Sequence, residues 1–229
     1  VYDGEALAGK GIVVVNINYR MGLLGFFAHP ELTKESSHHA SGNYGLLDQV
    51  AALQWIKKNI AAFGGDPDKV TIAGQSAGAS SVHALTASPL AKGLFVGAIA
   101  ESGSTYSTGA TTTKLTDAEQ SGVKFAQAKE AASLKELRAL SVDQLTKTPV
   151  QGVTFGVITD GWFLPESIPV IFAQGKQNDV PTLTGLTADE GSSSATYGKT
   201  TLTAFKEQAQ TTFKEQGDSF LKLYTADTD

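Results

Sequence analysis

One serine stands in a setting that can turn a hydroxyl group into a nucleophile. Ser76 lies at the centre of Gly74-Gln75-Ser76-Ala77-Gly78. The preceding run 69–73 predicts a strand, and the following residues 79–85 predict a helix. Gly-x-Ser-x-Gly between a strand and a helix is the nucleophile-elbow pattern, in which a tight turn pushes the serine hydroxyl outward. The spacing therefore predicts a nucleophilic serine; a capping serine in a glycine-rich turn is the alternative interpretation.

The residues around the serine have their own expected roles. Side chains two positions before and after it are expected to collide with the helix or the strand, so glycine is expected to be required at both 74 and 78. The amide of Ala77 is predicted to lie at a helix N-terminus, where it can donate to a developing negative charge.

An esterase-type serine also needs a base and an acid that orients the base. Asp189 and Glu190 follow the predicted strand 180–185, where such an acid is expected, but both are equally compatible with solvated loop carboxylates. Asp160 competes with them, although its Asp-Gly sequence is as typical of a turn.

None of the histidines in the chain is suitably placed to act as the general base for Ser76. The chain has four histidines, at positions 29, 38, 39 and 83. His83 follows Ser76 by about two helical turns, too far for a hydrogen bond to the hydroxyl. His38 and His39 lack partners at ligand spacing, so no metal site is predicted. Because no histidine follows Glu190, either the base lies beyond residue 229 or the triad hypothesis is wrong.

Strands and helices alternate along the chain and must position these groups. The β-branched run 11–19 predicts a central strand buried on both faces. A helix is predicted over 44–63, and further strands over 94–100 and 180–185. This alternation predicts a parallel, doubly wound α/β sheet.

The composition changes after residue 104 and suggests three segments. We expect a core segment over 1–104 that carries the serine. A helical insert of the same domain follows over 105–149, and a core continuation over 150–229 carries the acid. Within the insert, a polar loop is predicted over 105–113, followed by a helix that Thr116-Asp117 can cap and that runs to about residue 129. A second helix over 133–140 is predicted to begin with Ser133 as its cap, and a third over 142–145. A further helix is predicted over 201–216, stopped by Gly217.

Composition narrows the classes of partner. The 229 residues carry 18 basic and 23 acidic side chains, a net charge of −5 without a basic cluster, so nucleic acid is not a predicted partner. The chain has no cysteine, which excludes disulfides and a thiol nucleophile. No apolar run is long enough to span a membrane. We expect the natural N-terminus to precede Val1 and favour a periplasmic or secreted location; the oligomeric state is left open.

Several motifs recur together in one family. They are Asn18-Tyr19-Arg20, residues 42–49, residues 52–55, Phe63-Gly64-Gly65-Asp66-Pro67, the pentapeptide at 74–78, Glu101-Ser102-Gly103-Ser104, Asp160-Gly161 and Asp189-Glu190-Gly191. This set resembles the type-B carboxylesterases, the relatives of cholinesterases, bacterial p-nitrobenzyl esterases and some fungal lipases. The resemblance is dense over 11–104 and sparse afterwards.

The resemblance implies part of an α/β-hydrolase fold, with a mostly parallel central sheet and helices on both faces. It implies a serine hydrolase that cleaves small-molecule carboxylic esters through an acyl-enzyme, without a cofactor. Matched position by position, Ser76 is the nucleophile and Ala77 gives an oxyanion-hole amide. Glu190, rather than Asp189, is the triad acid, and Ser102 is a buried serine that supports it.

The same resemblance implies that the catalytic histidine lies beyond residue 229. It also implies that a glycine-rich loop with further oxyanion donors lies before Val1. The 229 residues alone are therefore expected to be inactive. Gln75 replaces the family's common glutamate, which removes a negative charge beside the nucleophile and disfavours a cationic, choline-like substrate. A non-catalytic binding or adhesion module on the same fold is the alternative, which the presence of Ser76 and Glu190 disfavours.

Overall fold

The computed structural model describes residues 3–103, 113–195 and 197–227. The chain forms two compact units, Val1–Gly185 and Leu186–Asp229. The boundary between the two units, after Gly185, lies within the predicted segment 150–229. Most of the predicted polar loop 105–113 lies outside the described residues.

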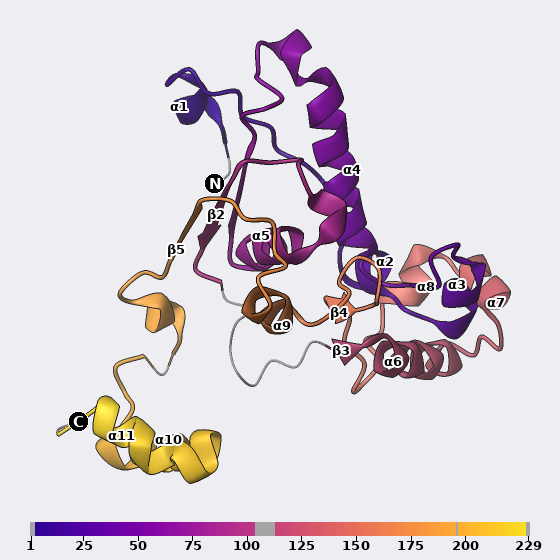
Figure 1. Cartoon of the computed structure of the whole chain (residues 1–229). Coiled ribbons are helices and arrows are strands. Elements are labelled where there is room, and N and C mark those ends of the chain that lie inside the picture. Colours follow the sequence, from indigo (N-terminus) through magenta and orange to yellow (C-terminus); the bar gives the residue numbers. More distant parts are fainter. Residues whose placement is uncertain (1–2, 104–112, 196, 228–229) are drawn as a thin grey trace. The chain divides into compact units, whose positions relative to one another are not determined.

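A three-stranded parallel sheet forms the centre of the first unit (Figure 1). Its strands are β1 (Thr71–Gln75), β2 (Gly97–Glu101) and β5 (Thr182–Gly185), in the order β1-β2-β5. Glu101 of β2 is aligned with Gln75 on one side and Gly185 on the other. The three strands therefore end at the same level, so the loops that follow β1 and β2 leave the same edge of the sheet.

One long helix packs on this sheet, and a second packs on that helix. Helix α5 (Ala77–Ala87) packs on β1 and β2, and α4 (Tyr44–Asn59) packs against α5. The buried residues of α4 follow helical spacing, which is why the 44–63 pattern predicted the helix correctly. A 3-10 turn, η1 (Ile60–Phe63), extends it to the predicted end.

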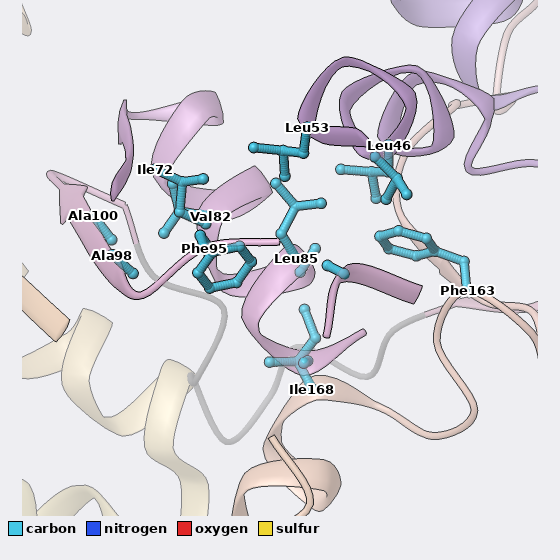
Figure 2. Packing of buried hydrophobic residues seen from close by; sticks show 14 of the residues in the cluster. Leu46, Leu53, Ile72, Val82, Leu85, Phe95, Ala98, Ala100, Phe163 and Ile168 are labelled. Atoms are coloured by element: carbon cyan, nitrogen blue, oxygen red, sulfur yellow. The ribbon is translucent and has the colours of Figure 1, made fainter. Parts of the chain in front are cut away.

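The main hydrophobic cluster joins these helices to the sheet and to α9 (Ile168–Ala173) (Figure 2). Its buried members are Leu46, Val50, Leu53, Ile56, Ile60, Ile72, Ala79, Val82, Ala84, Leu85, Ala87, Ala91, Phe95, Ala98, Ala100, Phe163, Leu164, Ile168 and Ile171. Because α5 contributes buried residues along most of its length, it is fixed from both sides.

The predicted central strand over 11–19 is wrong. Residues 12–20 are described and lie outside every helix and strand, and Ile12 and Val13 are 53% and 43% exposed. β-branched residues favour a pleated, half-buried surface, but a strand also needs a hydrogen-bonded neighbour, which propensity cannot supply. Among the described residues the sheet consists of β1, β2 and β5 alone.

The segment 113–159 contains three helices, and buried residues from it form a second hydrophobic cluster together with Phe27 of the preceding segment. Its helices are α6 (Leu115–Ala128), α7 (Leu134–Ala139) and α8 (Val142–Thr146), and a short parallel pair joins β3 (Thr113–Lys114) to β4 (Ile158–Thr159). Ser133 caps α7 as predicted, because its side chain accepts a hydrogen bond from the Glu136 amide. Helix α6 begins before the predicted Thr116-Asp117 cap.

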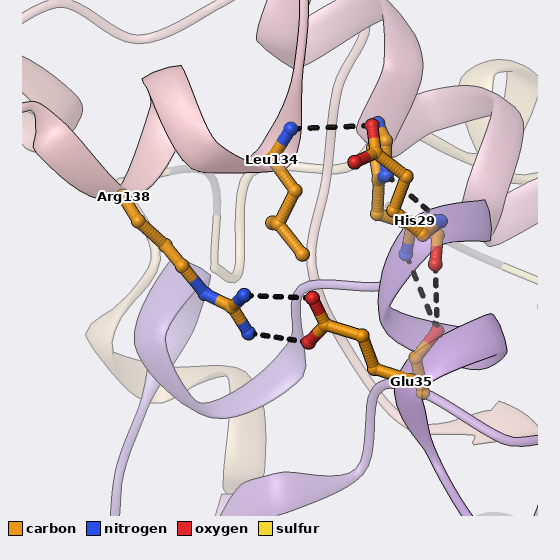
Figure 3. A network of polar contacts seen from close by, with 6 residues as sticks. His29, Glu35, Leu134 and Arg138 are labelled. Carbon is orange, nitrogen blue, oxygen red and sulfur yellow. Dashed lines mark hydrogen bonds and ion pairs between the residues drawn. The ribbon is translucent and has the colours of Figure 1, made fainter.

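An earlier helix, α3 (Pro30–Glu35), is bonded to α7 by two contacts (Figure 3). Arg138 forms two parallel hydrogen bonds with the Glu35 carboxylate, at 2.9 and 2.8 Å. The Leu134 amide donates to Glu31 at 3.2 Å. Two segments about a hundred residues apart are thereby held side by side.

The remaining elements of the first unit are short. They are α1 (Glu5–Ala8), α2 (Gly22–Phe26) and the 3-10 turn η2 (Pro89–Ala91). Among the described residues, no helix combines the length and the apolar character needed to cross a bilayer.

The second unit is mainly helical. It contains η3 (Glu190–Ser193), α10 (Leu202–Phe213), η4 (Lys214–Gln216) and α11 (Gly217–Leu223). The prediction that Gly217 stops the helix is wrong, because Gly217 has helical dihedral angles and begins α11. The chain turns instead at Lys214, whose φ is +49°.

Candidate active site

Ser76 occupies the turn between β1 and α5, at the position that the sequence predicts. Its φ of +56° and ψ of −113° lie outside the regions that L-residues ordinarily populate. Its amide donates to the Glu101 carbonyl oxygen at 2.9 Å, and its side chain is solvent-exposed. A strained backbone of this kind persists only where the surrounding structure holds it, and it is common at functional sites.

The two glycines of the motif differ in their surroundings. A Cβ atom at Gly74 would lie 2.4 Å from the backbone of Gly78, so strand and helix approach too closely for any side chain there. A Cβ atom at Gly78 would meet no described atom within 4 Å beyond its chain neighbours and the backbone of its own helix. The expected collision is therefore present at Gly74, and the expectation for Gly78 is wrong, because the side chain of a helical residue points away from the strand here.

Ala77 is the first residue of α5, as predicted for an oxyanion donor. The first amides of a helix have no partner within it and carry a partial positive charge. Gln75 is the last residue of β1, exposed and aligned with Glu101. Both neighbours of Ser76 therefore lie at the C-terminal edge of the sheet.

The end of β2 folds directly against Ser76. Ser102 is half-buried, has a φ of +52°, and donates its amide to the Gly185 carbonyl oxygen at 2.9 Å. A Cβ atom at the next residue, Gly103, would lie 2.6 Å from the Ser76 carbonyl oxygen. The structure thus brings the predicted residues 75, 76, 77 and 102 to one edge.

The predicted acids lie in the second unit. Glu190 is exposed at the start of η3 and accepts a hydrogen bond from the Thr187 amide at 3.0 Å. Asp189 accepts a hydrogen bond from the Tyr197 hydroxyl, which raises the pKa of that phenol. Ser76 and Glu190 therefore belong to different compact units of this chain.

The competing acid, Asp160, organises its own turn. Its carboxylate is buried and accepts hydrogen bonds from the amides of Trp162 and Leu164, at 3.1 and 2.9 Å. Burial raises its pKa, while these donors and the Asn43 side chain lower it. The arrangement is that of a turn-forming aspartate.

The four histidines lie in three different settings. His29 caps α3 by accepting a hydrogen bond from the Glu31 amide. His38 stacks on Trp162 with ring centroids 3.8 Å apart, and the adjacent His39 has a φ of +51°. His83 is buried on α5, and burial lowers the pKa of its imidazole.

The close approach of Gly103 to the Ser76 carbonyl oxygen is a feature that sequence reasoning missed. The only signal for it is a glycine after a predicted strand, and that signal names no partner. Within the described part of the chain, no group of three or more His, Cys, Asp or Glu side chains has the geometry to hold a metal ion.

Comparison with known proteins identifies the family. A family model described as the carboxylesterase family matches residues 1–228. Fumonisin B1 esterase from Sphingopyxis macrogoltabida is 38% identical over 239 residues, covering 100% of this chain and 43% of that protein. Para-nitrobenzyl esterase from Bacillus subtilis (strain 168) is 41% identical over 204 residues, covering 83% of this chain and 40% of that protein.

The fold agrees with a solved structure of the same kind. A carboxylesterase from Geobacillus stearothermophilus superposes with a TM-score of 0.77 at 33% identity, covering 99% of this chain and 49% of that one. The chain spans less than half the length of the curated relatives above. The predicted family and the predicted α/β-hydrolase fold, present in part, are thus confirmed: this chain belongs to the carboxylesterase family.

Proposed function

We propose that this chain carries the nucleophile of a serine hydrolase that cleaves carboxylic esters through an acyl-enzyme. The observation that carries the proposal is the strained, exposed Ser76 between β1 and the start of α5. A hydroxyl in such a turn meets a substrate carbonyl without any movement of the backbone, so part of the orientation is provided before the substrate binds.

The first step is attack of the Ser76 oxygen on the ester carbonyl. The carbonyl oxygen becomes an oxyanion beside the Ala77 amide, at the positive end of the α5 dipole. Collapse of this intermediate expels the alcohol and leaves an acyl group on the serine. Water then attacks the acyl-enzyme in the same way and releases the acid.

The proton transfers need two further groups. We assign the orienting acid to Glu190 and the base to a histidine outside these 229 residues, which contain no histidine after Glu190. Ser102 supports the acid in this scheme. The other oxyanion donors come from a glycine-rich loop, also outside these residues.

The substrate assignment stays at the level of a small-molecule carboxylic ester. The neutral Gln75 beside Ser76 places no charge next to the reacting carbonyl, which supports an uncharged ester over a cationic one. No cofactor is part of the proposed reaction.

The test compares two serine variants of the full-length protein with an aryl ester such as p-nitrophenyl acetate. We expect Ser76→Ala to lower kcat by about 10⁴-fold or more, because the nucleophile is removed. The control is Ser80→Ala, one helical turn further along α5, for which we expect turnover close to that of the wild type. Substantial turnover by Ser76→Ala would overturn the assignment. Absence of turnover from the wild type itself would favour the alternative, a non-catalytic binding module.

A further inference from the structure

We propose that Gly103 is a positioning residue, whose missing side chain allows the segment at the end of β2 to hold Ser76 in its strained turn. The proposal rests on the function proposed above, because it concerns the same serine. Gly103 has no side chain with which to meet a substrate. Its effect on the reaction must therefore be exerted through the residues that its backbone approaches.

The segment 101–103 contacts Ser76 at both of its peptide groups. At the start of the segment, the Glu101 carbonyl oxygen accepts a hydrogen bond from the Ser76 amide at 2.9 Å. At its end, a Cβ atom on Gly103 would lie 2.6 Å from the Ser76 carbonyl oxygen. Strained dihedral angles persist only where the surroundings over-determine them. One short segment supplies such surroundings on both sides of the strained residue.

The same segment is bonded to the strand that leads to the proposed acid. Its middle residue, Ser102, donates its amide to the carbonyl oxygen of Gly185, the last residue of β5, at 2.9 Å. Ser102 has a φ of +52°, which is uncommon for a residue with a side chain. The segment 101–103 thus lies between the end of β1, which carries the nucleophile, and the end of β5. A shift of the segment changes the position of Ser76 relative to β5.

Space, rather than the sign of φ, requires glycine at position 103, because Gly103 is not among the glycines with a positive φ. A Cβ atom there would also lie 2.7 Å from the Ala79 Cβ atom, in the first turn of α5. Cβ atoms do not approach other heavy atoms this closely, so the segment or the start of α5 must move. The Ser76 carbonyl oxygen accepts a hydrogen bond from the Ser80 amide at 3.1 Å, so its displacement also disturbs the helix start.

The test uses Gly103→Ala in the full-length protein, with Gly65→Ala as the matched control. A Cβ atom at Gly65 would lie 2.6 Å from the Ile60 Cγ1 atom and 3.3 Å from the Ile60 carbonyl oxygen, and Gly65 also lacks a positive φ. Gly65 precedes β1, whereas Ser76 follows it. The two substitutions therefore introduce comparably short contacts, only one of them at the serine.

A second variant combines Gly103→Ala with Ala79→Gly. The added glycine removes the overlap with the Ala79 Cβ atom and leaves the overlap with the Ser76 carbonyl oxygen. Ala79→Gly alone is its reference, because glycine weakens a helix by itself. This pair separates crowding against the helix from crowding against the serine.

We expect Gly103→Ala to lower kcat for an aryl ester by about 10- to 100-fold with KM within about threefold, because a reacting group shifted by about 1 Å has effects of this size. Covalent labelling of Ser76 by a fluorophosphonate should slow by a similar factor. The double variant should stay at least about 10-fold below Ala79→Gly alone in kcat. Gly65→Ala should lower the melting temperature and leave kcat within about threefold. A merely structural role for Gly103 would give its variant the same result as Gly65→Ala.

Three results would overturn the proposal. The first is a folded Gly103→Ala protein with wild-type kcat, and the second is a folded double variant that matches Ala79→Gly alone. The third is failure of both Gly103 variants to fold, which would show that the glycine serves the fold as a whole. The Ser76→Ala variant is measured in parallel. If that variant retains turnover, the proposed function fails. If it is inactive while the Gly103 variants have wild-type kcat, the Gly103 proposal alone fails.

Discussion

At the scale of single residues, the two glycines of the motif around Ser76 differ in what surrounds them. Gly74 and Gly78 are equivalent in the Gly-x-Ser-x-Gly pattern, and the sequence predicts the same steric reason for both. The structure shows the steric conflict at Gly74 alone, where a Cβ atom would lie 2.4 Å from the Gly78 backbone. The pattern places Ser76 correctly because strand, turn and helix are local features. The approach of backbones depends on tertiary geometry, which the pattern does not contain.

A pair of alanine substitutions separates the two glycines. We expect Gly74→Ala to lower the free energy of unfolding by about 1–3 kcal/mol, because the new methyl group overlaps the Gly78 backbone. Gly78→Ala should raise it by about 0.5–1 kcal/mol, because alanine restricts the unfolded chain and favours the helix. Urea unfolding of both variants measures the difference. Equal destabilisation by the two substitutions would contradict the geometry of the turn.

At the scale of helices and strands, the sequence predicts local features correctly and does not predict contacts between distant segments. The cap at Ser133 and the helix over 44–63 are correct because they depend on side chains within a few residues. The strand over 11–19 is wrong because strand formation depends on a partner far away in the sequence. The bond from Arg138 to Glu35 was equally unpredictable, since about a hundred residues separate its ends.

One side chain joins two elements in a way that a substitution can test. The Asn43 side chain donates to the Ile158 carbonyl oxygen at 2.9 Å and accepts from the Ile158 amide at 3.0 Å, and its φ is +53°. We expect Asn43→Ala to destabilise the protein by about 2–4 kcal/mol, because two buried backbone groups lose their partner. Asn59→Ala, which removes an exposed bond to the Trp55 carbonyl oxygen, should change stability by less than about 0.5 kcal/mol. Similar effects of the two in thermal unfolding would contradict the assigned role of Asn43.

Burial of His83 in α5 predicts a pH dependence of stability. Burial lowers the pKa of His83 in the folded state below its ordinary value of 6.5. As the pH falls below that value, the unfolded state binds more protons than the folded state, so the free energy of unfolding decreases. His83→Gln removes this titration and should flatten the decrease. Denaturant unfolding across this pH range measures both slopes, and equal slopes would show that His83 does not titrate on unfolding.

At the scale of the whole molecule, the fold class was predictable and the arrangement was not. Alternating strands and helices predict a parallel sheet, and the family motifs predict an α/β-hydrolase. The order β1-β2-β5 and the division at Gly185 have no counterpart in any local pattern. The candidate site shows the same limit: residues 75–77 could be placed from sequence, whereas the contact of Gly103 with Ser76 could not.

The proposed location of the base outside these residues makes a prediction about the histidines within them. In the full-length protein, we expect His38→Gln combined with His39→Asn to retain ester turnover within about twofold, because neither side chain serves as the base. Asparagine is chosen at 39 because it tolerates the positive φ found there. Steady-state kinetics with an aryl ester measures the effect. A loss of about 1,000-fold or more would place the base within this chain.

The most direct test of the central claim is covalent labelling of the full-length protein with a fluorophosphonate. Such a reagent forms a stable phosphonyl ester with an activated serine, and digestion with trypsin followed by mass spectrometry locates it. Cleavage after Lys69 and Lys92 gives a peptide that contains Ser76 together with Ser80, Ser81 and Ser88. We predict one adduct per chain, on Ser76, and none in the Ser76→Ala variant. An adduct on another residue, or an unlabelled wild-type protein, would contradict the account.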